Sequence, residues 1–506
     1  MLFNSYQFVL VFLPLLLIGY QLLARCGARS AVPMFLVLGS LLFYGWWDWR
    51  YLFLFGFSIA FNYSWAQALR PRSAAAADRR LAPRAMLAAG VAVNLGLLGY
   101  FKYRNFFVSS AAAVVGRHWE MPPVVLPLAI SFFTFEQLTY LTSAWRGEIE
   151  TRDFLSYTLF ITFFPHLIAG PIVRYGEIFP QLNRNSDYLL KADNLSAGLM
   201  IFAIGLFKKV MIADTFKLWL DPIFDTAIHP GFVEAWTATL AFALEIYFDF
   251  SGYSDMAIGL ARMFNVRFPE NFDSPYKARG PIEFWRRWHI TLSRFLRDYL
   301  YIPLGGNRRG EQRRYVNLMA TMLLGGLWHG AGWNFLVWGG LHGLYLCVNH
   351  LWQAWRGPSK PLFANGLAKA LSWTITFLAV VFAWVFFRAK TMAAAWQVLT
   401  ALFGLAPGGS DYVSPGVLRL MDLPVLVGEE SLLLIGAGAV ALALAVALTL
   451  PNVPQLFGYR EYRHASEPAS WLRWRPNLAW AALSAAALAL SLFGMWQRLE
   501  FLYFQF

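Results

Sequence analysis

Apolar runs of membrane-spanning or nearly spanning length recur along the whole chain. A spanning helix needs about 20 residues. The runs that approach this length are 7–24, 32–46, 51–68, 85–101, 124–144, 154–169, 195–213, 232–262, 315–329, 331–350, 370–387, 432–450 and 478–496. The shorter runs suit tilted, re-entrant or interfacial helices. The pattern predicts an all-α polytopic integral membrane protein with ten to twelve transmembrane helices.

Proline and glycine interrupt this pattern in two places. Pro165 and Pro171 lie in the segment 154–180, and Pro275 lies in the segment 270–312. Non-helical backbone at membrane depth is tolerated only where it is buried in protein or lines a wet cavity. We therefore expect both segments to be irregular, to include re-entrant and interfacial parts, and to border a central tunnel.

Composition supports the membrane assignment. The 506 residues are 58% hydrophobic and only 14% charged, against about 25% charged in soluble domains. The net charge of +13 does not indicate nucleic-acid binding, because Lys and Arg in short loops fix the cytoplasmic ends of membrane helices. Cys26 and Cys347 lie far apart and form neither a metal-ligand spacing nor a disulfide framework.

The distribution of charge predicts the topology. Residues 262–314 carry twelve basic and five acidic side chains, and the 70–84 loop is also basic, so both are placed on the cytoplasmic side. The acidic 405–431 loop and the tail 500–506 are placed outside. With no soluble domain or linker, 1–506 is interpreted as a single membrane domain.

Histidines beside glycines are the first candidates for chemistry. His329 ends an apolar run and precedes Gly330, which suits a general base or an acyl carrier at a cavity floor. The alternative is a histidine hydrogen-bonded between helices, but ionisable groups in membrane segments favour function. On a continuous helix His342 would lie on another face, so packing explains it better unless the helix breaks near Gly332.

A cationic aromatic patch is the second candidate. Trp285, Arg286, Arg287 and Trp288 precede His289, and guanidinium groups suit phosphate. An interfacial anchor of positive charge and tryptophan explains the same pattern equally well.

Carboxylates inside the apolar run 232–262 are the third candidate for a functional site. Glu245, Asp249 and Gly252 share a helical face. We interpret this stretch as cavity wall, against the alternative of inter-helix hydrogen bonds. The broken segment 165–174, with His166, is expected to shape a tunnel. The remaining histidines have no companion pattern and are interpreted as ordinary: His118, His229, His350 and His464.

Together these motifs resemble the membrane-bound O-acyltransferase superfamily, and more closely its AlgI-type alginate and polysaccharide O-acetyltransferases. The resemblance runs from Met1 to Phe506. The segments that carry it are Phe164–Pro171, Tyr247–Gly259, Phe284–Ser293, Arg297–Ile302, Leu304–Arg308, Gly325–Ala331 and Phe504–Phe506.

The resemblance implies a catalytic His329, a second motif histidine His289 and a catalytic region of about 154–350. It implies transfer of acetyl from cytoplasmic acetyl-CoA, without a metal, across the bacterial inner membrane to an extracellular polysaccharide such as alginate or cellulose. A separate periplasmic SGNH-type enzyme is the expected partner. The expected acetyl-CoA-binding residues are Trp285, Arg286, Arg287, Trp288 and Asn307, and the expected cavity-lining residues are His166, Asp249, Ser251, Tyr253, Asp255, Asp298 and His342.

Two other functions stay open from the sequence. An exporter of lipid-linked sugar could use the same polar cavity, although the internal repeats common in transporters are not evident. A non-catalytic scaffold in a polysaccharide-secretion complex is the other.

Overall fold

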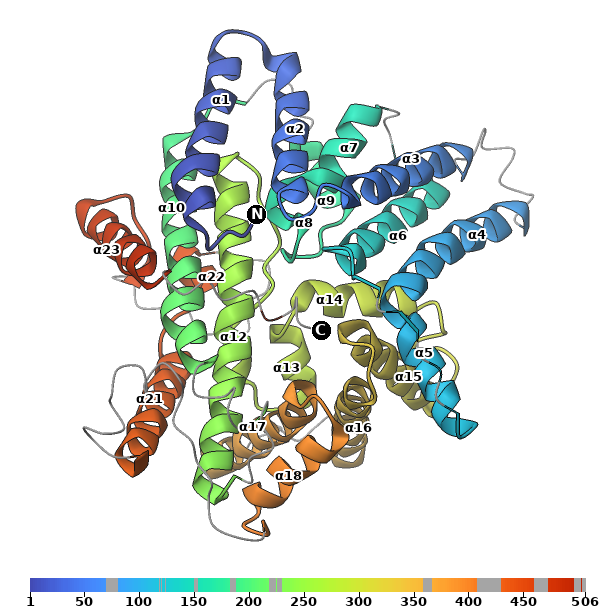
Figure 1. Cartoon of the computed structure of the whole chain (residues 1–506), viewed down its shortest axis with the longest axis vertical. Helices are drawn as coiled ribbons and strands as arrows, with labels where there is room; N and C mark the ends of the chain where they lie inside the picture. The colour runs from blue at the N-terminus through green and yellow to red at the C-terminus, as the bar shows by residue number, and fades with distance from the viewer. Residues whose placement is uncertain are drawn as a thin grey trace. The chain divides into compact units, whose positions relative to one another are not determined.

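The computed structural model is helical throughout the part of the chain that it describes (Figure 1). The described residues are 1–69, 81–117, 119, 121–122, 124–149, 153–182, 188–217, 224, 230–357, 366–406, 429–458, 472–495 and 502. Within them, five helical stretches are long and apolar enough to cross a membrane: Gln7–Arg25, Arg84–Val114, Ala192–Lys217, Gly366–Arg388 and Leu433–Phe457. A multi-pass membrane protein follows, and the count of ten to twelve spans stays a prediction.

The chain forms two compact units. The first comprises Met1–Leu206, Tyr253–Pro269 and Pro476–Arg498. Its helices are α1 (Leu13–Arg25), α2 (Val32–Gly45), α3 (Tyr51–Leu69), α4 (Leu81–Leu98), α5 (Arg104–Val114), α6 (Ile130–Arg146), α7 (Phe154–Thr162), α8 (Phe164–Leu167), α9 (Tyr175–Leu182), α10 (Ala192–Phe207) and α23 (Leu478–Gly494). Within it α1 pairs with α2, and α3, α4 and α6 pack against one another (Figure 1).

The second unit comprises Phe207–Gly252, Glu270–Arg475 and Leu499–Phe506. It takes the larger part of α12 (Phe232–Met263), whose last residues belong to the first unit. Its other helices are α13 (Pro281–Arg287), α14 (Ile290–Leu296), α15 (Glu311–His329), α16 (Trp333–Arg356), α17 (Gly366–Arg388), α18 (Met392–Leu402), α21 (Glu429–Thr449) and α22 (Val453–Phe457).

The apolar runs predicted most of these helices. The run 232–262 is α12, and the runs 315–329 and 331–350 are α15 and α16. The two segments expected to be irregular contain only short helices and turns, since proline and glycine interrupt the helical hydrogen bonds there. Helix α18 was not predicted. Residues 70–80, 407–428 and 503–506, which carry part of the topology prediction, lie outside the described residues.

Helices α15 and α16 form a tight antiparallel hairpin in the second unit (Figure 1). Two glycines permit the close approach: a Cβ added at Gly326 would lie 2.2 Å from the Phe335 carbonyl oxygen, and one added at Gly339 would lie 2.3 Å from that of Met322. Between the helices the backbone is extended at Gly330 and Gly332. In this hairpin the C-terminal end of α15 packs against the side of α16.

Candidate active site

His289 occupies a strained turn between α13 and α14. Its φ of 41° and ψ of 55° are left-handed, a conformation uncommon outside glycine and often found at functional sites. The surrounding backbone holds it there, because the Ile290 N–H donates to the Asn271 carbonyl at 2.9 Å and the Asp273 N–H donates to that of Arg287. The ring is fully buried. A tertiary loop contact therefore positions this histidine.

The hydrogen bonds around Asn271 define the tautomer of His289. The Thr291 N–H and hydroxyl both donate to Asn271 Oδ1, at 3.3 and 2.9 Å. This atom must be an oxygen, because a backbone N–H can only donate. His289 Nδ1, 3.1 Å from the same oxygen, therefore carries the proton, and Nε2 keeps its lone pair.

That lone pair is available in the described structure. His289 Nε2 is buried and has no hydrogen-bond partner among the described residues. Burial lowers the pKa of His289 to about 3, so the ring is neutral at physiological pH. A neutral, oriented imidazole with a bare nitrogen can accept a proton from a substrate hydroxyl.

His329 lies next to it at the C-terminal end of α15. The two imidazole centroids are 6.4 Å apart. Aromatic rings surround His329 at centroid distances of 4.9 Å for Trp328, 5.0 Å for Trp338 and 5.3 Å for Phe387. The structure thus brings together the two histidines that the motifs singled out, inside a ring-lined interior.

His342 joins this aromatic cluster because the helix breaks between His329 and α16. Its ring lies 4.8 Å from that of Trp338, which also contacts His329. Trp285 Nε1 donates to His342 Nδ1 at 3.3 Å. His342 is buried, and it holds the indole of Trp285 in place instead of facing a described cavity.

A cavity of about 690 Å³ lies in the second unit, a size typical of ligand sites. Neither His289 nor His329 lines it, but Ile290, the residue after His289, does. Trp285 and Ile290 form part of its wall. The polar lining residues are Arg286, Ser293, Arg294, Arg297, Tyr301, Asn307, Arg314, Thr321 and His350. Four guanidinium groups line the cavity, of which Arg297 is paired with Asp298, and no carboxylate is among these lining residues. The resulting positive charge attracts anions.

The two neighbouring arginines of the patch have different roles. Arg286 lines the cavity. Arg287 is 4% exposed, and its guanidinium bonds to Glu283 at 2.8 Å and lies 3.5 Å from an Asp273 carboxylate oxygen. The expectation that Arg287 binds phosphate therefore fails, because its donors are directed to these carboxylates and to the Asp273 carbonyl.

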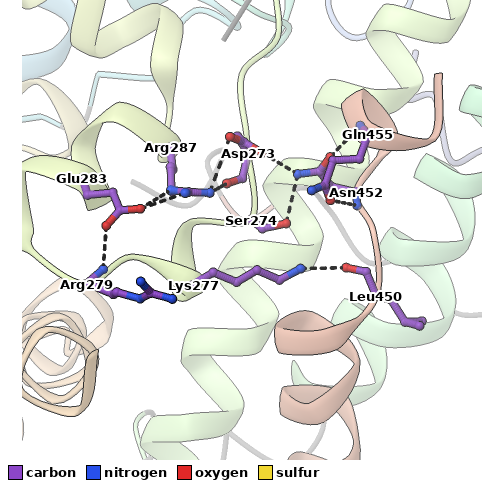
Figure 2. A network of polar contacts seen from close by, with 9 residues as sticks. All are labelled: Asp273, Ser274, Lys277, Arg279, Glu283, Arg287, Leu450, Asn452 and Gln455. Atoms are coloured by element: carbon purple, nitrogen blue, oxygen red, sulfur yellow. Dashed lines mark hydrogen bonds and ion pairs between the residues drawn. The ribbon is translucent and has the colours of Figure 1, made fainter. Parts of the chain in front are cut away.

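Figure 2 shows what the Arg287 ion pairs connect. Asn452 Nδ2 donates to Asp273 Oδ1 at 2.8 Å and to the Ser274 hydroxyl at 3.0 Å, and Asn452 also caps α22. Lys277 donates to the Leu450 carbonyl. The network ties α13 and the loop before it to the segment between α21 and α22, so it stabilises the turn that carries His289.

Trp288 and Asp249 also differ from expectation. Trp288 is buried, stacked on Phe284 and packed against Trp384, so it belongs to the core. Asp249 is buried with Oδ1 2.6 Å from Lys209 Nζ, and the backbone N–H of Leu502 donates to its Oδ2 at 3.0 Å. This carboxylate binds a lysine and the tail, and it does not line either described cavity.

The other expected cavity residues are dispersed. His166 pairs with Glu136 at 2.7 Å and bonds to the Phe160 carbonyl, Tyr253 stacks on Phe3, and Asp298 pairs with Arg297. Ser251 and Asp255 are buried on α12. None of these five lines either of the two described cavities.

Sequence reasoning missed His350 and Arg314. His350, interpreted as ordinary, lines the cavity and contacts the Arg314 guanidinium. The missed signal is helical spacing. His350 lies four residues after Leu346, another lining residue, and residues four apart lie on the same face of a helix.

Comparison with known proteins identifies the chain. A model of the membrane-bound O-acyltransferase family matches residues 124–391, which include both histidines and the whole cavity. The chain is 42% identical over 431 residues to a peptidoglycan O-acetyltransferase of Helicobacter pylori, covering 80% of each protein. The chain belongs to the membrane-bound O-acyltransferase family.

Other relatives place it among the AlgI-type members. It is 41% identical to a probable alginate O-acetylase AlgI of Pseudomonas aeruginosa, over 80% of this chain and 75% of that protein. It is 27% identical to a teichoic acid D-alanyltransferase of Bacillus subtilis, over 52% of this chain and 69% of that protein. The chain is therefore a membrane-bound O-acyltransferase enzyme.

Proposed function

We propose that this protein transfers acetyl from cytoplasmic acetyl-CoA across the inner membrane for O-acetylation of an extracellular polysaccharide, such as alginate or cellulose. A periplasmic SGNH-type enzyme would receive the acetyl group. Relatives named as O-acetyltransferases of alginate and peptidoglycan support the reaction class. The basic charge of 262–314 supports a cytoplasmic donor site.

The observation that carries the proposal is the basic cavity, whose wall includes Ile290, the residue that follows His289. CoA is polyanionic, and Arg286, Arg294 and Arg314 are suited to its phosphates. Trp285 lies in the cavity wall and its ring is 5.9 Å from that of Trp338, which in turn contacts His329. The cavity wall is thus connected through two ring contacts to the aromatic cluster that contains His329.

Two chemical routes suit this geometry. In the first, an acceptor hydroxyl attacks the thioester carbonyl, a histidine takes the hydroxyl proton, the C–S bond breaks and the proton passes to the CoA thiolate. In the second, a ring nitrogen of His329 attacks the thioester carbonyl, the C–S bond breaks and CoA leaves as its thiolate. An acceptor hydroxyl then attacks the acetyl carbon, the N–C bond to His329 breaks, and the hydroxyl proton passes to the CoA thiolate. Membership of the family favours an acyltransferase, by either route, over the alternative functions of exporter and scaffold.

The decisive experiment follows labelled acetyl-CoA with purified protein in detergent or vesicles. We expect release of CoA and appearance of label in a hydroxyl acceptor, with water as the background acceptor. An exporter or scaffold would leave the thioester intact. Intact acetyl-CoA in the presence of both a partner enzyme and polysaccharide would contradict the proposal.

Arg286→Ala is expected to weaken acetyl-CoA binding about 5–30-fold at low salt, because one charge-assisted contact contributes about 1–2 kcal/mol. The loss should shrink as ionic strength rises, since screening acts over about 8 Å at physiological salt. Calorimetry of CoA binding at two salt concentrations measures both effects. If the variant bound CoA as tightly as wild type at all salt concentrations, the role of Arg286 would be limited to fixing the membrane topology.

Arg287→Ala is the matched control, one residue away and with the same charge change. It leaves Glu283 and Asp273 without their cation, and breaking such a buried pair costs about 3–5 kcal/mol. We expect a lower midpoint of thermal unfolding with no direct salt-dependent effect on CoA affinity. Comparing the Arg286 and Arg287 variants should therefore separate a loss of CoA binding from a loss of stability.

Deleting 502–506 is expected to preserve CoA binding while abolishing partner co-purification and polymer acetylation. Leu502 is docked on buried Asp249, away from the residues that line the basic cavity. Aromatic residues dominate interface hot spots, and the sequence after Leu502 contains three of them. Undiminished co-purification after deletion would assign the tail to membrane anchoring.

A further inference from the structure

A second cavity, of about 420 Å³, lies in the first unit, and the proposed acetyl transfer uses none of its residues. Five helices meet at it near their ends: Tyr20 comes from the last turns of α1, Leu36 from the first turns of α2, Gln181 from α9, Asn194 from the first turn of α10 and Arg262 from the last turn of α12. Two of these helices, α1 and α10, belong to stretches that are able to span a membrane. The cavity therefore lies at the level where membrane helices end.

Its charge is positive. Lys191, Arg262 and Arg267 line it, and no carboxylate is among the described lining residues. The nearby Asp193 is exposed in the first turn of α10 and does not line the cavity. The first turn of α10, which carries Asn194, also places the positive end of the helix dipole at this end of the unit. These features together favour a ligand with negative charge.

Side-chain amides hold the rim in place. Gln181 Oε1 accepts the Arg267 N–H at 2.9 Å, and its Nε2 donates to the Arg267 carbonyl at 3.0 Å. Asn194 donates to Asn265 Oδ1 at 2.8 Å, and Asn265 donates to the Leu189 carbonyl. Asn265 has a φ of 63°, which its short polar side chain tolerates. The rim is thus organised before any ligand binds.

The floor of the cavity is apolar and packed. Tyr20 and Phe264 meet edge to face at 5.2 Å, and Tyr188 packs against Tyr20 at 6.2 Å. All three rings are at least nine-tenths buried. Polar and basic side chains thus line the cavity beside a closed aromatic base, which suits a small charged head group better than a long molecule inserted into the unit.

We propose that this cavity binds the phosphodiester head group of an anionic phospholipid. Basic pockets between the ends of membrane helices are suited to such head groups, whose phosphates lie at the same depth. Arg262 and Lys191 would contact the phosphate, and the Asn194 amide, which also lines the cavity, would contact the polar remainder. This site is independent of acetyl transfer, and its test does not measure activity.

Purified full-length protein is compared in nanodiscs of phosphatidylcholine with and without phosphatidylglycerol, by native mass spectrometry and thermal unfolding. The variants are the pocket double Lys191→Gln/Arg262→Gln and the control double Arg25→Gln/Arg29→Gln. The control removes the same charge from the same end of α1, at exposed residues outside the cavity. A third arm replaces the anionic lipid with inorganic phosphate.

We expect the wild type and the control double to retain phosphatidylglycerol and gain thermal stability from it. The pocket double should bind about 25-fold more weakly, since each of the two replaced basic residues, which line the cavity, contributes about a fivefold effect. Equal loss in both doubles, or no preference for anionic lipid, would overturn the proposal. Equal thermal protection by inorganic phosphate would indicate a soluble anionic ligand in the cavity and overturn the proposal of a bound lipid. If the pocket double fails to fold, Lys191→Gln alone, at an exposed position, makes the same comparison.

Discussion

Replacing His329 with alanine is expected to lower acetyl transfer by about 10²–10⁴-fold, the usual cost of losing a general base. The ring lies 6.4 Å from His289 and is enclosed by Trp328, Trp338 and Phe387. An imidazole in such surroundings can accept a hydroxyl proton or carry an acetyl group. The measurement is the rate of label transfer from acetyl-CoA, together with polymer acetylation in cells.

Truncating a buried ring also leaves a cavity, so stability must be measured alongside activity. His329→Gln approximates the volume and polarity of the ring but cannot act as a base near neutral pH. We expect it to be as inactive as His329→Ala while unfolding closer to the wild-type temperature. Polymer acetylation at the wild-type level in cells carrying His329→Ala would refute the catalytic role.

Gly339→Ala is expected to separate α15 from α16 and prevent stable folding. The added Cβ would lie 2.3 Å from the Met322 carbonyl oxygen and 3.2 Å from the Gly326 Cα, and backbone atoms cannot move aside as a flexible side chain can. Overpacking costs about 1–3 kcal/mol and occasionally more, and this contact belongs at the upper end. Thermal unfolding and detergent-solubilised yield measure the loss.

The adjacent Gly340→Ala is the matched control. Its Cβ would lie 3.5 Å from Leu323 Cδ2, an ordinary contact. Alanine also favours helix over glycine by about 1 kcal/mol, so this variant should be as stable as wild type or more stable. Equal behaviour of the two variants would show that close packing of the α15–α16 hairpin is not what the glycines provide.

Helix positions followed from local sequence, because a spanning helix satisfies its own backbone hydrogen bonds and needs only a long apolar run. The run 232–262 became α12, and the breaks at Pro275 and Pro281 became the irregular segment around α13. Helix α18 is short, with only eleven residues, and its apolar pattern did not reach spanning length. The motifs likewise identified His289 and His329, since these residue types are unusual in such an apolar chain.

The roles of individual side chains depended on tertiary structure. Arg286 and Arg287 are identical neighbours in sequence, but successive helical positions point about 100° apart. One therefore lines a cavity, and the other meets Glu283 and Asp273. His289 obtained its tautomer from Asn271, eighteen residues away. The sequence by itself determined the membrane helices and the reactive residue types; long-range packing decided which nitrogen is free, which arginine faces the cavity and which carboxylate is already paired.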